Sequence, residues 1–234
     1  MLVEFFSLEV NQRFIVPMEI GTSTAPFLAA LIARRSLLRE PAGLIALGWG
    51  ISTVSSVFKT AMNRGYFADT LAAHRLELLV VTACLLYGMM QWIDGVSRRT
   101  RWVVLAGWAA ACAFTLLINV KREFTLMTQP LQAFVVLAMA GTALASRVRA
   151  AEAPLARMDW FWILTAHITY FSGTLVRMPI QESLVRNHWN WGYPLHFAIM
   201  FVYSVSYLVI ARGMLLTGSD QRPTTGGIPL TRPA

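Results

Sequence analysis

Long stretches without charged side chains recur along this 234-residue chain, and they limit its possible folds more than any other feature. A helix needs ~20 mostly apolar residues to cross the hydrocarbon core of a bilayer. The stretches therefore predict an all-α fold, a polytopic integral membrane bundle of seven transmembrane helices. The predicted spans lie at about 14–33, 41–59, 75–93, 102–120, 124–146, 160–177 and 194–212.

The composition favours the same fold. Hydrophobic residues make up 56% of the chain, charged residues make up 14%, and the mean hydropathy is +0.53. A soluble domain, which must cover its surface with polar groups, does not use such a composition. We expect residues 1–216 to form one transmembrane domain in contact with the lipid bilayer. Residues 217–234 are rich in Pro, Gly and Thr and are expected to form a flexible cytoplasmic tail.

The first span is the least regular of the seven because it contains Glu19, Gly21 and Pro26. Its uncharged part, residues 20–33, is short for a crossing unless Glu19 lies at the headgroup level or faces the interior of the bundle. The alternative is that the helix starts after Glu19, at about Ile20. If this segment does not cross, the bundle has six spans.

Basic residues near helix ends predict the orientation, since they are retained on the cytoplasmic side. With seven spans, alternate loops divide the 20 basic residues into twelve on one side and eight on the other. The larger set consists of Arg34, Arg35, Arg39, Arg98, Arg99, Arg101, Arg147, Arg149, Arg157, Arg212, Arg222 and Arg232. We therefore expect the C-terminus in the cytoplasm and the N-terminus outside, in a bacterial inner (plasma) membrane. Because the charges are scattered, the net charge of +8 does not indicate nucleic-acid binding.

Ionisable side chains within a membrane usually face the bundle interior and mark a function. Such residues here are Glu19, His74, Glu77, His167 and His196. All but His167, which lies near the middle of the sixth span, belong to the outer half of the bundle. We expect all five residues to line a polar cavity in the outer half. Glu19 and Glu77 would face it between the first, third and seventh helices.

His74 and Glu77 also form a candidate metal site. They are three residues apart and share one helix face, which is the spacing with which a histidine and a carboxylate bind one metal ion. His196 would be the third metal ligand or, together with His74, a haem ligand. The alternative is a helix start solvated at the headgroup boundary. The sequence requires no cofactor. If one is bound, its identity is unknown from the sequence.

His167 has two interpretations. A histidine near the middle of a span can relay protons. It can equally be a neutral residue that is hydrogen-bonded to a same-face neighbour such as Tyr170, or to a carbonyl across the bundle.

Small residues and prolines predict how the helices pack. Gly48, Ser52 and Ser56 recur every four positions in the second span, so we expect this stripe to touch a neighbouring helix. A stripe lined with hydroxyls can also border a polar pathway. Pro26 and Pro130 are expected to break the first and fifth helices.

Three classes of function remain open. Broken first and fifth helices and a polar outer half favour a small-solute transporter or a ligand-binding seven-helix bundle. A non-catalytic structural or accessory subunit of a multi-chain membrane complex is the alternative, and it would associate with other membrane subunits or with itself. A membrane redox subunit that binds haem or metal through His74 and His196 is the third class.

Enzymatic activity has no support from motifs. The chain contains no P-loop, no G-x-S-x-G, no H-E-x-x-H and no paired intramembrane aspartates. The span at 194–212 has no lysine for a retinal Schiff base. We therefore assign no catalytic residue.

Overall fold

The computed structural model describes residues 16–61, 71–118, 124–187 and 192–216, and within these ranges it is helical without strands. The all-α prediction is confirmed for these residues. The elements, in chain order, are α3 (Val16–Ser23), α4 (Ala25–Ile32), α5 (Pro41–Ala61), α6 (Leu71–Met90), α7 (Arg98–Ile118), α8 (Phe124–Arg149), the 3-10 helix η3 (Leu155–Arg157), α9 (Asp159–Asn187) and α10 (Gly192–Leu215).

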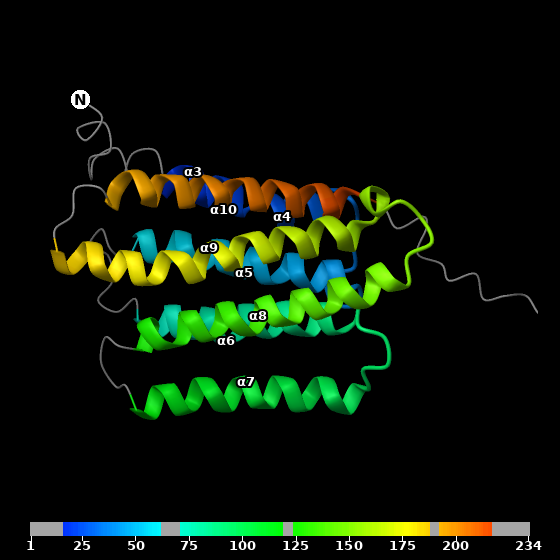
Figure 1. The fold of residues 1–234 in the computed structure, drawn as a ribbon, viewed down its shortest axis with the longest axis horizontal. Helices are drawn as coiled ribbons and strands as arrows, with labels where there is room; N and C mark the ends of the chain where they lie inside the picture. Colours follow the sequence, from blue (N-terminus) through cyan, green and yellow to red (C-terminus); the bar gives the residue numbers. More distant parts are fainter. Residues whose placement is uncertain (1–15, 62–70, 119–123, 188–191, 217–234) are drawn as a thin grey trace, which may run out of the picture.

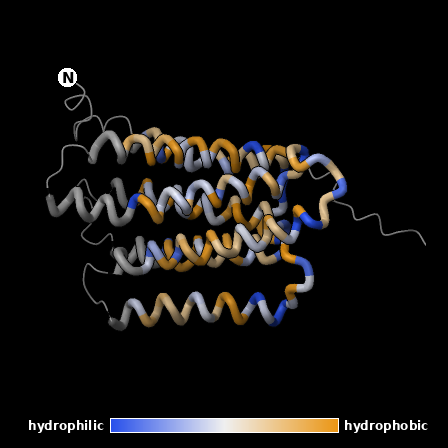
Figure 2. The backbone as a smooth tube through the Cα atoms, viewed as in Figure 1, coloured by the Kyte–Doolittle hydropathy of each residue, from blue (hydrophilic) through white to orange (hydrophobic). Residues whose placement is uncertain are grey.

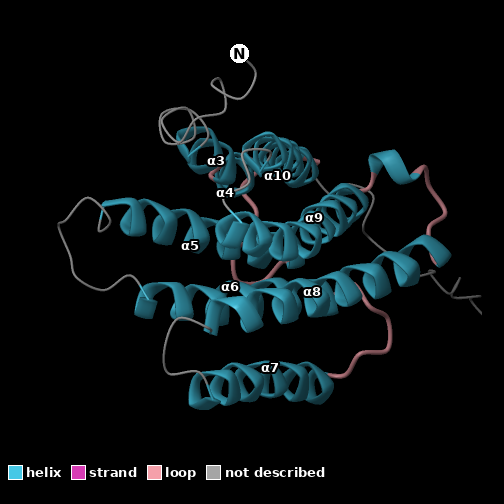
Figure 3. Cartoon of the chain, turned by 60° about the vertical axis from the view of Figure 1, so that its left-hand side comes forward, coloured by secondary structure: helices cyan, strands magenta, loops and turns pink. Residues whose placement is uncertain are grey.

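The helices form two layers with their axes along one direction (Figure 1). One layer holds α4, α5, α6 and α7 in chain order, and the chain returns through α8, α9 and α10 in the other (Figure 3). Across the layers, α10 packs against α4, α9 against α5, and α8 against α6. The α7 helix closes the row and lies against α6 and α8. The fold is therefore a helical meander that turns back on itself at α7.

Local sequence signals set several helix ends. The hydroxyl of Ser97 accepts a hydrogen bond from the Thr100 amide at 3.1 Å, which caps the start of α7. At the end of α4, Arg34 adopts a left-handed conformation with a φ of 53°. The Arg34 amide bonds to the Leu31 carbonyl at 3.0 Å and the Arg35 amide to the Ala30 carbonyl at 2.9 Å. This Schellman motif stops α4 and directs the chain into the loop before α5.

The two predicted proline breaks differ in outcome. The first helix is broken, because α3 ends at Ser23 and α4 begins at Ala25, directly before Pro26. The predicted break in the fifth helix is wrong, since α8 continues through Pro130. Pro130 lies in the second turn of α8. The hydrogen bond that its missing N–H would have donated therefore falls close to the helix start, where other N–H groups also lack helical partners.

Three of the described helices are long and apolar enough to cross a membrane by length and composition. They contain the stretches Pro41–Phe58, Thr128–Arg149 and Phe197–Leu215, of 18, 22 and 19 residues. These helices suggest a membrane association, although they are fewer than the seven spans predicted. Within the described residues, the apolar part of α6 is the shorter stretch Glu77–Met90, and three arginines open α7.

The outer surface of the bundle is apolar. On α10, Phe201, Val205 and Leu208 are 57%, 42% and 54% exposed, and their spacing places them on one helix face. On α7, Trp102 and Phe114 are also exposed. Hydrophilic residues gather at the end of the bundle that carries the loops 33–40, 91–97 and 150–158 (Figure 2). An apolar surface next to a polar end is what a lipid environment favours.

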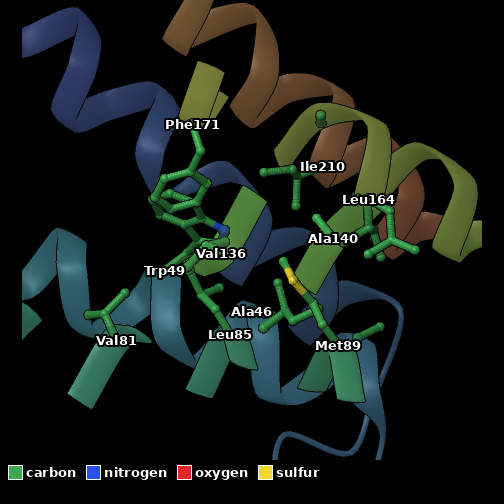
Figure 4. Close-up of a cluster of buried hydrophobic side chains, with 14 of the residues drawn as sticks. Ala46, Trp49, Val81, Leu85, Met89, Val136, Ala140, Leu164, Phe171 and Ile210 are labelled. Atoms are coloured by element: carbon green, nitrogen blue, oxygen red, sulfur yellow. The ribbon is translucent and has the colours of Figure 1, made fainter. Parts of the chain in front are cut away.

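The core lies between the two layers and is built by close approach of helices (Figure 4). Trp49, Leu85, Val136 and Leu164 come from four different helices and are at most 3% exposed. A Cβ atom added at Gly48 would lie 3.2 Å from the Cys84 Cβ and 3.4 Å from the Val81 carbonyl oxygen of α6. The Gly48 stripe thus touches a neighbouring helix, as predicted.

We expect Gly48→Leu to lower the free energy of unfolding by ~1–3 kcal/mol, because a side chain there overpacks the contact between α5 and α6. Gly107→Leu on α7 is the matched control, since a Cβ at Gly107 meets nothing within 4 Å. Thermal unfolding in detergent measures both. Equal melting temperatures for the two variants would contradict the close approach.

Arg35 joins three parts of the chain at the end that carries the described loops. Its guanidinium lies 3.0 Å from the Asp159 carboxylate and 3.4 Å from that of Glu40. It also donates to the Met214 carbonyl at 3.2 Å and to the Leu216 carbonyl. The Arg35 and Asp159 side chains are only 10% and 2% exposed. The loop before α5 is therefore fixed to the start of α9 and the end of α10.

Arg35→Ala should lower the free energy of unfolding by ~3–5 kcal/mol, because Asp159 would keep a buried charge and lose the cation beside it. Arg39→Ala removes an exposed arginine of the same loop and should change stability by less than ~0.5 kcal/mol. Denaturant titration in detergent compares them. A similar loss of unfolding free energy in both variants would show that Arg35 acts only through the net charge of the loop, and not through its contact with Asp159.

Candidate functional site

A cavity of about 120 Å³ lies within the bundle between α5, α6, α8, α9 and α10. Glu77 and Gln129, near the starts of α6 and α8, place it in the half of the bundle away from the described loops (Figure 1). Its walls combine apolar side chains with polar and charged ones. The polar lining residues are Ser52, Glu77, Gln129, Gln132, Tyr170, Thr174, Arg177 and Tyr203.

Glu77 is held at the cavity by α5. Ser52 donates a hydrogen bond to one carboxylate oxygen at 2.8 Å, and Ser55 donates to the other at 3.0 Å. The two serines are three residues apart, so both hydroxyls lie on the face of α5 that packs against α6. Charge-assisted hydrogen bonds of this kind stabilise an ionised carboxylate. The small-residue stripe of the second predicted span therefore also positions an acid.

Aromatic side chains form one wall. The rings of Tyr170 and Tyr203 have centroids 4.3 Å apart, and the Trp49 ring meets Tyr170 edge-on at 5.2 Å. The Tyr203 hydroxyl donates to the Thr174 hydroxyl at 3.0 Å. Behind them, the Tyr207 hydroxyl donates to that of Tyr170 at 3.2 Å. These contacts fix the aromatic faces relative to the cavity.

His167 supports this wall from behind and does not line the cavity. Its side chain is completely buried. The Trp49 indole N–H donates to its Nε2 at 3.1 Å, and its Nδ1 lies 2.6 Å from the Ile163 carbonyl oxygen. A nitrogen that accepts and a nitrogen that faces a carbonyl require the neutral ring with the proton on Nδ1. The geometry agrees with the interpretation of a neutral, hydrogen-bonded histidine.

Several lining residues were not singled out from the sequence as site residues. Arg177 lies in α9 with its guanidinium carbon 5.9 Å from the centroid of the Tyr203 ring. Gln132 donates to the Thr82 hydroxyl at 2.7 Å, and Gln129 precedes it by one turn. The available signal was the presence of two amides, three residues apart, in an otherwise apolar stretch. That spacing does not show which helix faces pack against each other.

The five predicted cavity residues have three outcomes. Glu77 lines the cavity, whereas Glu19, which is half-buried on α3, and His167 are not among the lining residues. The side chains of His74 and His196 lie outside the described residues, so the metal and haem predictions that use them stay predictions. Among the described residues, no three His, Cys, Asp or Glu side chains are grouped so that they could hold a metal ion.

Comparisons with protein-family models, with curated proteins and with solved structures find no match to this chain.

We expect His167→Leu to lower the free energy of unfolding by ~1–3 kcal/mol, because the buried Trp49 N–H would lose its acceptor. Trp49→Phe removes the same hydrogen bond from the other side. In a double-mutant cycle measured by thermal unfolding, the two changes should couple by ~0.5–3 kcal/mol. Additive effects would show that the hydrogen bond contributes nothing to the position of Trp49.

Proposed function

We propose that this chain is a seven-helix membrane bundle that binds a small polar solute, as a small-solute transporter or a ligand-binding bundle. The observation that carries the proposal is the cavity. A carboxylate, a guanidinium and two amides line a space inside a bundle whose outer surface is apolar.

Seven crossings are supported by the arrangement of the helices. The three apolar helices α5, α8 and α10 are interleaved with α6, α9 and the α3–α4 pair, and all share one axis direction (Figure 1). A bilayer that surrounds the three apolar helices would also surround their neighbours. The exposed apolar side chains of α7, among them Trp102 and Phe114, would then face lipid.

The distribution of arginines supports a cytoplasmic position for the end that carries the described loops. The described residues of that end include Arg34, Arg35, Arg39, Arg98, Arg99, Arg101, Arg147, Arg149, Arg157 and Arg212. Basic residues concentrate on the cytoplasmic side of plasma-membrane proteins. In this orientation, in a bacterial inner membrane, the cavity lies in the outer half and the C-terminus is cytoplasmic.

Packing alone does not account for the chemistry of the cavity. Ionisable groups inside a membrane are costly, and apolar side chains of similar volume pack helices at least as well. Glu77 and Arg177 therefore favour a polar ligand or a solvated pathway. The hydrogen bonds from Ser52 and Ser55 to Glu77 hold this polar wall in one geometry, which lowers the entropy lost on binding.

Cysteine labelling tests the proposal. In a Cys84→Ala, Cys112→Ala background, Gln129→Cys should react with sulfonatoethyl methanethiosulfonate, because water in the cavity allows the thiolate to form. Val136→Cys is the matched control, since Val136 is completely buried on the same face of α8, two turns deeper.

We expect Gln129→Cys to react at least ~tenfold faster than Val136→Cys, and faster in right-side-out than in inverted vesicles. Equal rates for the two cysteines would refute a water-accessible cavity. Faster reaction in inverted vesicles would reverse the orientation.

A further inference from the structure

We infer that the exposed face of α7 binds an anionic phospholipid of the cytoplasmic leaflet, with the lipid phosphate at Arg98 and Arg99. The inference rests on the membrane bundle and the orientation proposed above, and not on solute binding. The ligand belongs to the class of lipids with a net negative headgroup, such as phosphatidylglycerol.

The α7 helix lies at the edge of the bundle and has one free face (Figure 3). Its inward face is fixed by Trp108, which is 4% exposed and donates its indole N–H to a backbone carbonyl of α6 at 3.3 Å. The other face includes Arg98, Arg99, Trp102 and Val103, all of them exposed. Residues four apart lie above one another on a helix, so these four residues share that face. The two arginines and the free apolar face are therefore parts of one surface.

The start of α7 carries an excess of positive charge. It holds Arg98, Arg99 and Arg101, whereas the preceding loop, 91–97, holds one acid, Asp94. The Arg101 side chain donates to a backbone carbonyl of that loop at 3.3 Å. In the described part of the chain, the side chains of Arg98 and Arg99 form no hydrogen bond and no ion pair. Two arginines are thus available to a phosphate, which a guanidinium binds through paired hydrogen bonds.

Trp102 marks the depth of the lipid headgroups. Its ring is 55% exposed and lies beside the Tyr87 ring of α6, with the two centroids 6.2 Å apart. Tryptophan and tyrosine rings favour the boundary between the headgroups and the hydrocarbon. Arg98 precedes Trp102 by about one turn, on the side of the polar loops. Its guanidinium therefore lies at the level of the lipid phosphates.

The remainder of the free face suits an acyl chain. Beyond Val103 its exposed positions are small as far as Phe114, which is 63% exposed. These small residues are Ala106, Gly107, Ala109, Ala110 and Ala113. From Trp102 to Phe114 the helix rises ~18 Å, which is close to the ~15 Å of hydrocarbon in one leaflet. An acyl chain can therefore lie along the helix between the two aromatic rings.

A second copy of the chain is the competing occupant of this face, since small residues also let membrane helices pack closely. In a symmetric dimer within a membrane, the α7 helices would meet with Arg98 and Arg99 of both copies at the same depth. Like charges that face each other across an interface disfavour association. The charge of the face therefore favours an anionic lipid, which neutralises both arginines.

Native mass spectrometry of the full chain, with equal amounts of phosphatidylglycerol and phosphatidylcholine added to the detergent, tests the inference. We expect at least ~fivefold more retained phosphatidylglycerol than phosphatidylcholine, and the double variant Arg98→Gln, Arg99→Gln should lower this ratio at least ~fivefold. The matched control is Arg39→Gln, Arg157→Gln, which removes two exposed arginines from other loops of the same end and should keep the ratio within ~twofold. Ala110→Phe keeps every charge but occupies the place of the acyl chain, so it should lower phosphatidylglycerol retention at least ~twofold.

The outcomes separate this inference from the proposed function. Equal retention of the two lipids, or an equal loss in the α7 double variant and its control, would refute a lipid site on α7. A dimer that Ala110→Phe dissociates would assign the face to a second copy of the chain and would also refute it. In each case the proposed function stands if Gln129→Cys still reacts faster than Val136→Cys. Equal thiol rates would refute the proposed function and leave the lipid ratio unchanged.

Discussion

Lipid cannot form hydrogen bonds, so polar groups inside a membrane bundle must find partners within the protein. Several buried polar groups described here have such partners. Arg35 binds Asp159 and two carbonyls, His167 lies between Trp49 and a carbonyl, and Glu77 lies between two serines. The Arg35 and His167 sets join segments that are distant in sequence, and the Glu77 set joins the consecutive helices α5 and α6. Among the described residues, the Arg101 Nε and the Thr165 hydroxyl are buried without a hydrogen-bond partner.

The two ends of the bundle are joined by different contacts. At the end with the described loops, one buried guanidinium links the loop before α5 to α9 and α10. In the other half, α5, α6, α8, α9 and α10 surround a cavity, and the described contacts there include hydroxyl hydrogen bonds, aromatic rings and the two hydrogen bonds to the Glu77 carboxylate. Both ends are therefore joined in part through a charged side chain.

Much of the helix arrangement follows from the sequence, because charged residues and turn signals mark helix ends. The predicted span 41–59 matches α5 at Pro41–Ala61, and 124–146 matches α8 at Phe124–Arg149. Glu77 was predicted as a cavity residue, since an acid inside an apolar stretch needs a polar environment. Arg177 and Trp49 were not, because helical spacing shows which residues share a face and not which faces meet. Pro130 does not interrupt α8, because it lies only two turns from the helix start.

The break between α3 and α4 has a mechanical consequence. Pro26 has no backbone N–H, so an interruption at Thr24 sacrifices little of the helical hydrogen-bond ladder. Above the break, α3 is tied by two hydroxyl pairs, Ser23 to Thr53 at 3.1 Å and Thr22 to Ser204 at 3.2 Å. Below it, α4 leads directly into the anchored Arg35. The two halves of the first helix are thus held separately, α3 by hydroxyl contacts to α5 and α10 and α4 through the Arg35 contacts that follow it.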